Sequence, residues 1–329
     1  MNLDTIDWKA LERLRSAFLN HTAGAADYWM DERDLASYDQ TFAQRIGWKW
    51  DHVLAELPRL GWTPPPGGVL DWGCGSGIAG RAFLDHFGTQ GISELCLYDR
   101  SPLAVQYAAR RAREKYPGLE VTLGTGGTSP HGTLLVSHVL NELAPEQAVR
   151  LLQIASSFAA MIWIEPGTYE ASAALVGVRE RLRTQFQIVA PCTHSGACGL
   201  LDPANARHWC HHFASPPPEV YTGGPWAKFA NLVGIDLSSL PLSYLVLDQR
   251  PAPAWPAGAT RLLGTPRVSK HEALVFLCRA AGLGDCTVSK RALPEAYRQI
   301  KKGRAPVLAR CAFEGNAVVG FEALGQEGK

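Results

Sequence analysis

The sequence predicts an α/β protein built on a doubly wound sheet of parallel strands, and three observations lead to that prediction. An apolar stretch, Val69–Trp72, runs into a glycine-rich turn and then into a helical pattern. Strand and helix patterns alternate from residue 66 to residue 186, as they do when helices connect parallel strands. A proline- and glycine-rich linker over residues 63–68 separates this alternation from the segment before it.

The predicted elements divide the chain into four parts. Residues 1–65 form a helical extension, because their apolar residues recur at helical spacing. Residues 66–186 form the Rossmann-like core, residues 187–242 a Cys- and His-rich insertion with little periodicity, and residues 243–329 a small, basic, β-rich part. The strands predicted for the core are Gly68–Trp72, Glu94–Tyr98, Leu119–Leu123, Thr133–His138 and Met161–Glu165, with helices near residues 78–87, 102–115, 145–158 and 169–185. The strands predicted for the C-terminal part are Tyr244–Asp248, Arg261–Leu263, Ala273–Cys278 and Cys286–Ser289.

Composition sets the class of protein. The chain has 329 residues, 46% hydrophobic residues and a net charge of +1, as in a globular protein with a large core. It contains no apolar run close to the roughly 20 residues that span a bilayer. The first residues lack the apolar centre of a signal peptide. We therefore expect a cytoplasmic monomer with no membrane partner, whose eight cysteines serve as thiols or metal ligands.

Positive charge is concentrated near the C-terminus. Residues 261–310 hold eleven Lys and Arg residues against three acids, which favours a nucleic-acid partner. A solvated surface is the simpler alternative for a run of charge. The candidate RNA-binding residues are Lys290, Arg291, Arg298, Lys301, Lys302 and Arg304.

The glycine-rich turn indicates a nucleoside-type cofactor. Glycines at positions 73, 75 and 77 let the backbone turn sharply and approach a ligand closely. A dinucleotide fingerprint needs a further glycine where Ile78 stands. The turn instead resembles the first motif of class I S-adenosylmethionine methyltransferases, where the acid before it, Asp71, suits the ammonium group of the cofactor. Asp99 follows Gly77 by 22 residues and ends the second strand, a position from which an acid binds ribose hydroxyls. The candidate cofactor-binding residues are Asp71, Gly73, Cys74, Gly75, Gly77, Asp99 and Ser137.

Candidates for catalysis follow the fourth and fifth strands. His138 and Asn141 come after the fourth strand and Glu165 ends the fifth, where side chains of this fold face the ligand crevice. Methyl transfer needs alignment of the two substrates, and a base where the acceptor carries a proton. The sequence does not identify that base, and Asn141 and Glu142 could instead cap the next helix.

A second group of residues indicates a metal centre. Cys192, Cys198 and Cys210 lie in a segment rich in turns, which favours ligation of a soft metal. Cys278 is the best candidate for a fourth ligand, with Cys286 as its rival. Four histidines keep a zinc site open: His194, His208, His211 and His212. Cys74 and Cys96 are expected to be packing residues.

The chain resembles the methyltransferase-like proteins of the mitochondrial small ribosomal subunit and their bacterial relatives. The resemblance extends over roughly residues 66–300 and rests on these segments: Val69–Gly77, Ser137–Leu143, Glu165–Thr168, Ala190–Cys198, Trp209–Phe213, Ser243–Leu247 and the strand ending in Cys278. It implies a four-iron four-sulfur cluster held by Cys192, Cys198, Cys210 and Cys278, and association with small-subunit rRNA during assembly. The chain departs from the family at residues 234–242, where an acidic, lysine-bearing stretch is replaced.

These observations predict a protein that binds S-adenosylmethionine, carries an iron–sulfur cluster and acts on small-subunit ribosomal RNA. One alternative is a ribosome assembly factor that uses the same fold as a binding platform without catalysis. A second alternative is a small-molecule methyltransferase with a zinc-stapled lid.

Overall fold

The computed structural model describes residues 2–20, 27–124, 132–251 and 255–324. Its largest element is an eight-stranded sheet with the order β3-β2-β1-β4-β5-β8-β6, in which β7 also pairs with β8. The strands β3, β2, β1, β4 and β5 are parallel, whereas β8 runs antiparallel to both β5 and β6. The predicted doubly wound α/β core is confirmed.

The strands of the core lie close to the predicted positions. The bounds are β1 Gly67–Trp72, β2 Ile92–Tyr98, β3 Glu120–Leu123, β4 Thr133–Ser137, β5 Ala160–Pro166, β6 Gln187–Ala190, β7 His212–Ala214 and β8 Leu240–Asp248. Strands β4 and β5 are buried almost throughout, because helices cover both faces of the sheet, as parallel sheets require.

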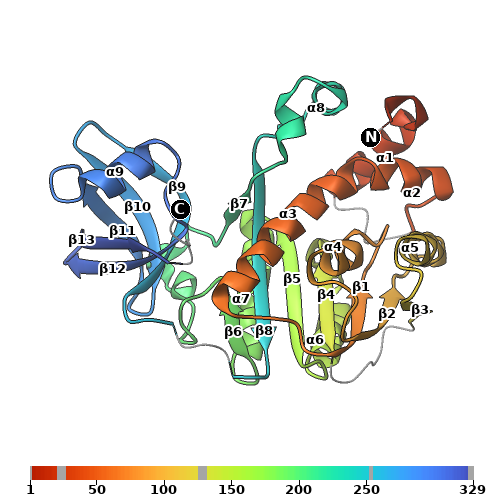
Figure 1. The fold of residues 1–329 in the computed structure, drawn as a ribbon, viewed down its shortest axis with the longest axis horizontal. Helices are drawn as coiled ribbons and strands as arrows, with labels where there is room; N and C mark the ends of the chain where they lie inside the picture. Colours follow the sequence, from red (N-terminus) through yellow and green to blue (C-terminus); the bar gives the residue numbers. More distant parts are fainter. Residues whose placement is uncertain (1, 21–26, 125–131, 252–254, 325–329) are drawn as a thin grey trace.

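Helices form a layer on each face of the sheet (Figure 1). The helix bounds are α1 Trp8–Leu19, α2 Glu32–Asp39, α3 Phe42–Glu56, α4 Ile78–Phe87, α5 Pro102–Lys115, α6 Pro145–Ala155, α7 Tyr169–Leu182 and α8 Pro225–Val233. Apolar residues of α3, α4 and α5 pack on one face, around Trp50 and Phe83. Residues of α6 and α7 pack on the other face, around Phe158 and Trp163. The helical extension is therefore part of the main core.

One strand lies in a different part of the molecule than its sequence position indicated. Tyr244–Asp248 was predicted within the β-rich C-terminal part, but it belongs to β8, in the large sheet between β5 and β6. Its residues are buried on both faces. Its sequence is therefore nearly continuously apolar, as in the buried strands of parallel sheets. The C-terminal β-rich part begins only after this strand.

That C-terminal part is a closed five-stranded barrel with the order β10-β11-β13-β12-β9. Its elements are β9 Ala259–Val268, β10 Glu272–Arg279, β11 Gly282–Ser289, α9 Pro294–Lys301, β12 Leu308–Glu314 and β13 Ala317–Ala323. It has its own small core, centred on Val275, Val288 and Tyr297. In Figure 1 the barrel stands beside the end of the sheet that carries β6.

A buried polar triad joins the extension, the sheet and the barrel. Arg261 of β9 forms an ion pair with Glu56 of α3, with 2.5 Å between Nη2 and Oε1. Arg261 also donates to the hydroxyl of Tyr244 in β8 at 3.1 Å, and that hydroxyl donates to Glu56 at 2.5 Å. Arg261 is 2% exposed. Loss of Glu56 would leave the buried Arg261 without its counter-charge, so the triad holds the three parts against one another.

Among the described residues, no helix is both long enough and apolar enough to cross a bilayer.

Candidate functional site

The glycine-rich turn has the conformation that its sequence predicts. Gly73, Gly75 and Gly77 have φ values of 71°, 50° and 79°, which L-residues with a Cβ rarely adopt. The amides of Gly73 and Cys74 donate to the carbonyl of Tyr98, at 2.7 and 2.9 Å. A Cβ on Gly73 would lie 2.6 Å from Val139, whereas one on Gly75 would meet no atom within 4 Å. The turn is therefore packed on one side and open on the other.

The open side of the turn faces a cavity of about 500 Å³ at the carboxyl ends of β1, β2 and β4. Asp99 lies at its wall and accepts hydrogen bonds from the amides of Gly75 and Ser101, both at 2.9 Å. Burial raises the pKa of Asp99, and these two hydrogen bonds oppose the rise. Gly73, Cys74 and Ser137 also line the cavity. Five of the seven predicted cofactor-binding residues thus lie together.

Two of the predicted cofactor-binding residues do not line this cavity. Asp71 is 0% exposed and accepts a hydrogen bond from the amide of Gly80 in α4, at 2.8 Å. Burial raises its pKa to about 7. Gly77 precedes α4, and a Cβ there would lie 2.9 Å from Ala108. Both residues hold the start of α4 in place beneath the turn, which is how they shape the cavity.

The helical extension forms a wall of the cavity that the sequence did not predict. Its lining residues are Arg15, Phe18, Leu19, Tyr28, Trp29, Tyr38, Phe42, Arg45, Ile46 and Lys49. Lys49 is buried, and its Nζ lies 3.3 Å from Nε2 of His138. A signal was present in the sequence, because Lys49 interrupts the apolar face that Ile46 and Val53 establish at helical spacing.

The Lys49–His138 pair forms a candidate proton acceptor. Burial, and then the charge of Arg45, lowers the pKa of Lys49 to about 7. Burial, and then Lys49, lowers the pKa of His138 well below its ordinary value. Nδ1 of His138 lies 3.3 Å from the hydroxyl of Ser137, which accepts from the indole of Trp50 at 3.0 Å. Both groups therefore favour their neutral forms more strongly than they would in water.

The predicted catalytic residues differ in how they meet the cavity. His138 has a φ of 55°, a conformation often found at functional sites, and lines the cavity together with Asn141. Glu142 also lines it, and burial raises its pKa to about 7. Neither Asn141 nor Glu142 caps α6: both lie in a short 3-10 turn, and Ala144 occupies the N-cap position.

Glu165 supports the turn that carries His138. Its Oε1 accepts hydrogen bonds from the amides of Val139 and Leu140, both at 3.2 Å, and from the indole of Trp163 at 2.7 Å. Its Oε2 is buried without a hydrogen-bond partner among the described residues. Burial raises the pKa of Glu165 to about 7. Glu165 does not line the cavity, so it lies behind the wall that His138 forms.

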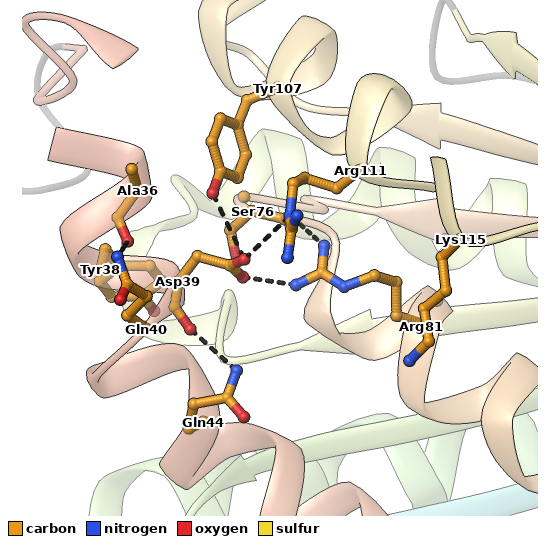
Figure 2. Close-up of polar contacts among 12 residues, drawn as sticks. Ala36, Tyr38, Asp39, Gln40, Gln44, Ser76, Arg81, Tyr107, Arg111 and Lys115 are labelled. Carbon is orange, nitrogen blue, oxygen red and sulfur yellow. Dashed lines mark hydrogen bonds and ion pairs between the residues drawn. The ribbon is translucent and has the colours of Figure 1, made fainter. Parts of the chain in front are cut away.

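A buried network connects the extension to the glycine-rich turn (Figure 2). Asp39 at the end of α2 forms an ion pair with Arg81 of α4, and both side chains are buried. Arg81 in turn donates to the carbonyl of Ser76, in the turn, at 2.6 Å. Asp39 also accepts from the hydroxyl of Tyr107 at 3.3 Å and lies 3.5 Å from Nε of Arg111. Arg81 thus links the helical extension to the glycine-rich turn.

Four predicted metal ligands line a second cavity. Cys192, Cys198, Cys210 and Cys278 all contribute to its wall, together with His194 and the buried Arg179. Burial, and then the nearby Cys192 and Cys198, raises the pKa of Cys278 to about 12, which reflects how close the thiols are. In the described part of the chain, no three His, Cys, Asp or Glu side chains converge closely enough to hold one metal ion.

The two rivals for the fourth ligand point in opposite directions. Cys278 lies on the outer face of the barrel, and its Sγ is 3.8 Å from Nε2 of His194. Cys286 is buried in the barrel core. Of the other predicted zinc ligands, His212 lies 3.6 Å from Sγ of Cys210. His208 and His211 stack on Phe276 and Trp209 instead.

The cysteine cavity also has positive charge beside it. Arg179 of α7 donates from Nε to Sγ of Cys192 at 3.2 Å, and it donates to the carbonyls of His194 and Gly196. Glu180 accepts from the amide of Cys198 at 3.0 Å. One helix therefore fixes the first two cysteines, and its guanidinium is placed to balance negative charge on sulfur.

The candidate RNA-binding residues form an exposed group. Lys290, Arg291, Arg298, Lys301, Lys302 and Arg304 are all exposed and lie between the end of β11 and the turn after α9. Arg298 forms an ion pair with Glu295 at 2.5 Å. For the other five, no ion pair occurs within the described residues. This is a basic end of the barrel.

The buried ion pair predicts the effect of Asp39→Asn. This substitution keeps the shape of the side chain but leaves Arg81 buried without its counter-charge. We expect the free energy of unfolding to fall by about 3 kcal/mol, measured by urea denaturation. The control is Asp31→Asn, which alters an exposed pair with Arg33 and should cost less than about 1 kcal/mol. Equal losses in the two variants would contradict the role given to Asp39.

The raised pKa of Glu165 predicts a pH-dependent stability. Because the folded-state pKa of about 7 lies above the ordinary value of 4.5, the folded protein binds more protons between these values. Its stability therefore falls as pH rises through this window. Glu165→Gln removes this titration, so its stability relative to the unmodified protein should rise by about 1–3 kcal/mol between pH 5 and pH 8. Urea denaturation at both pH values measures it.

The matched control for that measurement is Glu146→Gln in α6, an exposed position. Its stability relative to the unmodified protein should stay flat with pH. A flat difference for Glu165→Gln as well would show that the Glu165 carboxyl is not held in its protonated form.

Comparisons with known proteins identify the family. The model of the Rsm22 family, described as mitochondrial small ribosomal subunit Rsm22, matches residues 63–305. Similar solved structures include magnesium protoporphyrin IX methyltransferase (ChlM) from Synechocystis PCC 6803 with bound SAM, at 16% identity over 72% of this chain and 95% of that one, with a TM-score of 0.39. Another is the plantazolicin methyltransferase BamL, at 13% identity over 72% of this chain and 98% of that one, with a TM-score of 0.38. Comparison with curated proteins found no match. Because the family model covers most of the chain, this protein belongs to the Rsm22 family of mitochondrial small ribosomal subunit proteins.

Proposed function

We propose that this protein binds S-adenosylmethionine in the 500 Å³ cavity and acts on the rRNA of the small ribosomal subunit during its assembly. The observation that carries the cofactor proposal is the arrangement of Asp99 and Gly75 at the cavity wall. Membership of the Rsm22 family, named for the mitochondrial small ribosomal subunit, supports the proposed partner. The cytoplasmic location stays a prediction.

The residues at the cavity wall fit the chemistry of this cofactor. Each oxygen of Asp99 accepts one amide hydrogen bond and has a lone pair left for a ribose hydroxyl. The open side of Gly75 leaves room for a ligand against the backbone. Trp72, Tyr98 and Val139 supply apolar surface in the same cavity. A nucleoside with two vicinal hydroxyls would therefore find polar and apolar partners here.

The Lys49–His138 pair fits a role in proton transfer. The bound cofactor would supply the methyl group. An acceptor that carries a proton must release it when the methyl group arrives, and His138 or Lys49 could take it, since both have lowered pKa values. Glu165 positions this pair through the backbone at Val139 and Leu140.

Labelled S-adenosylmethionine and immature small subunits test this function. We expect methyl transfer to the rRNA by the unmodified protein. Asp99→Ala removes two acceptor oxygens, so it should weaken cofactor binding at least tenfold in calorimetry. Glu314→Ala, at an exposed position of β12 away from the cavity, is the control and should bind the cofactor normally.

Other outcomes of that experiment separate the alternatives. Binding of subunits without methyl transfer, and equally strong for Asp99→Ala, would support the non-catalytic assembly factor. Failure to bind subunits, with cofactor binding intact, would favour the small-molecule methyltransferase. Absence of cofactor binding by the unmodified protein would contradict the proposal itself.

We also propose that Cys192, Cys198, Cys210 and Cys278 hold a four-iron four-sulfur cluster. Four thiols on one cavity wall are a suitable donor set, and the nearby Arg179 and Arg261 would balance the negative charge of the ligated cluster. Ligands of a cluster bind different iron atoms, so they stand further apart than the ligands of one zinc ion. The metal analysis described below separates the cluster from zinc.

The proposed cluster would have a structural role. The first three cysteines belong to the insertion, whereas Cys278 belongs to the barrel. A cluster bound to all four would attach the insertion to the barrel. Since metal binding of this kind contributes directly to the free energy of folding, the insertion should become ordered only when the cluster is present.

Metal analysis of protein purified without oxygen tests the cluster. We expect iron and acid-labile sulfide in equal amounts. Cys210→Ala should lose both, because it removes one ligand. Cys286→Ala is the matched control and should keep both, because that thiol is inside the barrel. Zinc without sulfide would contradict the proposal, as would iron that survives in Cys210→Ala.

A further inference from the structure

The barrel has the topology of an OB-fold. The strands β9, β10 and β11 form a meander, α9 lies between β11 and β12, and β13 inserts between β11 and β12. The third and fifth strands, β11 and β13, are parallel, and β12 closes the barrel against β9. OB-folds bind oligonucleotides and oligosaccharides on the outer face of the second and third strands and on the adjacent loops. Here that face belongs to β10 and β11 (Figure 1).

The strand register orders the residues on this outer face. Ala273, Val275 and Leu277 point into the barrel core, so the residues that alternate with them point outward. The register places three outward rows across β9, β10 and β11: Arg261–Cys278–Leu283, Leu263–Phe276–Asp285 and Arg267–Leu274–Thr287. Cys278 and Leu283 of the first row and Leu263 of the middle row line the cysteine cavity. Phe276 and the whole third row lie outside it.

The middle row carries an aromatic platform. His208 stacks on Phe276, with ring centroids 4.2 Å apart and an interplanar angle of 24°. Trp209 stacks on His211 at 4.6 Å, next to the 40% exposed Phe213. His211 is within 3.3 Å of the position that a Cβ on Gly264 of β9 would take. Planar rings therefore line the junction of the insertion and the barrel, where nucleobases could stack on them.

The far end of the same face is basic. The amide of Lys290 donates to the carbonyl of His271 at 2.9 Å, and the hydroxyl of Tyr297 donates to the carbonyl of Ser269 at 2.6 Å. These bonds bring the β9–β10 turn, which contains Lys270, against the segment after β11. Lys270, Lys290 and Arg291 are exposed and have no ion pair among the described residues.

The charge of the barrel points to an anionic ligand. Residues 259–324 contain eleven Lys and Arg residues and five Asp and Glu residues, in a chain whose net charge is +1. The phosphates of a nucleic acid are attracted to such a basic surface. Aromatic rings next to it favour a nucleic acid, whose bases can stack on them, over an acidic protein. Bases can stack on protein rings only when they are not stacked within a duplex, which selects single strands.

We propose that the outer face of β9, β10 and β11, beyond the cysteine cavity, binds a single-stranded segment of RNA. The Phe276–His208 stack receives bases, and Lys270, Lys290 and Arg291 hold the phosphates. The inference rests on the proposed function for the identity of the RNA, and it goes further by naming the strand state and the face. It also explains why His208 stands two residues before Cys210: the segment that binds the proposed cluster also positions the platform.

Fluorescence anisotropy of the full chain, purified without oxygen, tests the proposal. The probes are a labelled single-stranded RNA of about 12 nucleotides, within the site size of one OB-fold, and a duplex of equal length. We expect at least tenfold tighter binding of the single strand. Phe276→Leu keeps an apolar side chain but removes the ring, and it should weaken this binding about tenfold. Lys270→Glu should weaken it and lower the salt dependence by about one released ion.

Two matched controls accompany these variants. Phe313→Leu removes a ring of β12 that packs against the barrel core and Arg279, and Arg310→Glu reverses an exposed charge on the same strand. Both should bind the single strand within twofold of the unmodified protein. If Phe276→Leu lowers the melting temperature, His208→Leu replaces it as the test of the stack.

Equal binding of duplex and single strand would overturn the proposal. So would Phe276→Leu and His208→Leu proteins that fold and bind normally, because the rings would then be irrelevant. Binding to immature small subunits is measured in parallel. If the unmodified protein binds subunits and Phe276→Leu, His208→Leu and Lys270→Glu do so equally, this inference fails while the proposed function stands. If the unmodified protein does not bind subunits, the proposed function fails.

Discussion

The buried ion pair between Glu56 and Arg261 joins parts of the molecule that are far apart in sequence. Glu56 ends a helix of the extension, Arg261 belongs to the barrel, and Tyr244 of the central sheet connects the two. A charge in this position is costly unless every partner is in place. The triad therefore holds the sheet, extension and barrel against one another, and each cavity lies at a junction between these parts.

The two cavities use this arrangement differently. The cofactor cavity lies between the sheet and the extension, so the extension determines its walls, and the Asp39–Arg81 pair connects it to the glycine-rich turn. The cysteine cavity lies between the sheet, the insertion and the barrel. Between β6 and β7 the insertion contains only two short 3-10 turns, so this cysteine-bearing segment needs attachment from both sides. Arg261 lies close enough to Cys210, in the wall of this second cavity, for its charge to oppose the rise that burial causes in the pKa of that thiol.

The sequence predicted what depends on local pattern. The strand–turn–helix at residues 67–87 and the position of Asp99 follow from spacing alone, and the structure has them where expected. It did not predict features that depend on tertiary packing. Lys49 reaches the cavity only because α3 crosses the sheet, and Asp71 lies under the turn because Gly80 brings α4 close to it. Leu240–Asp248 follows the insertion in sequence but pairs with β5 in space. The barrel topology depends on the pairing of β11 with β13, which no local pattern records.

The central claim is that this Rsm22-family protein combines a methyltransferase-fold cofactor site with a barrel surface for small-subunit rRNA. Ultraviolet crosslinking in the cells that make the protein, followed by sequencing of the attached RNA and mass spectrometry of the attached peptides, tests this claim most directly. The account predicts that the recovered RNA is mainly small-subunit rRNA from immature subunits, attached through peptides of β9–β11 and of residues 206–214. Crosslinks spread over cellular RNA in proportion to abundance, or attached through peptides outside the barrel and the insertion, would contradict it.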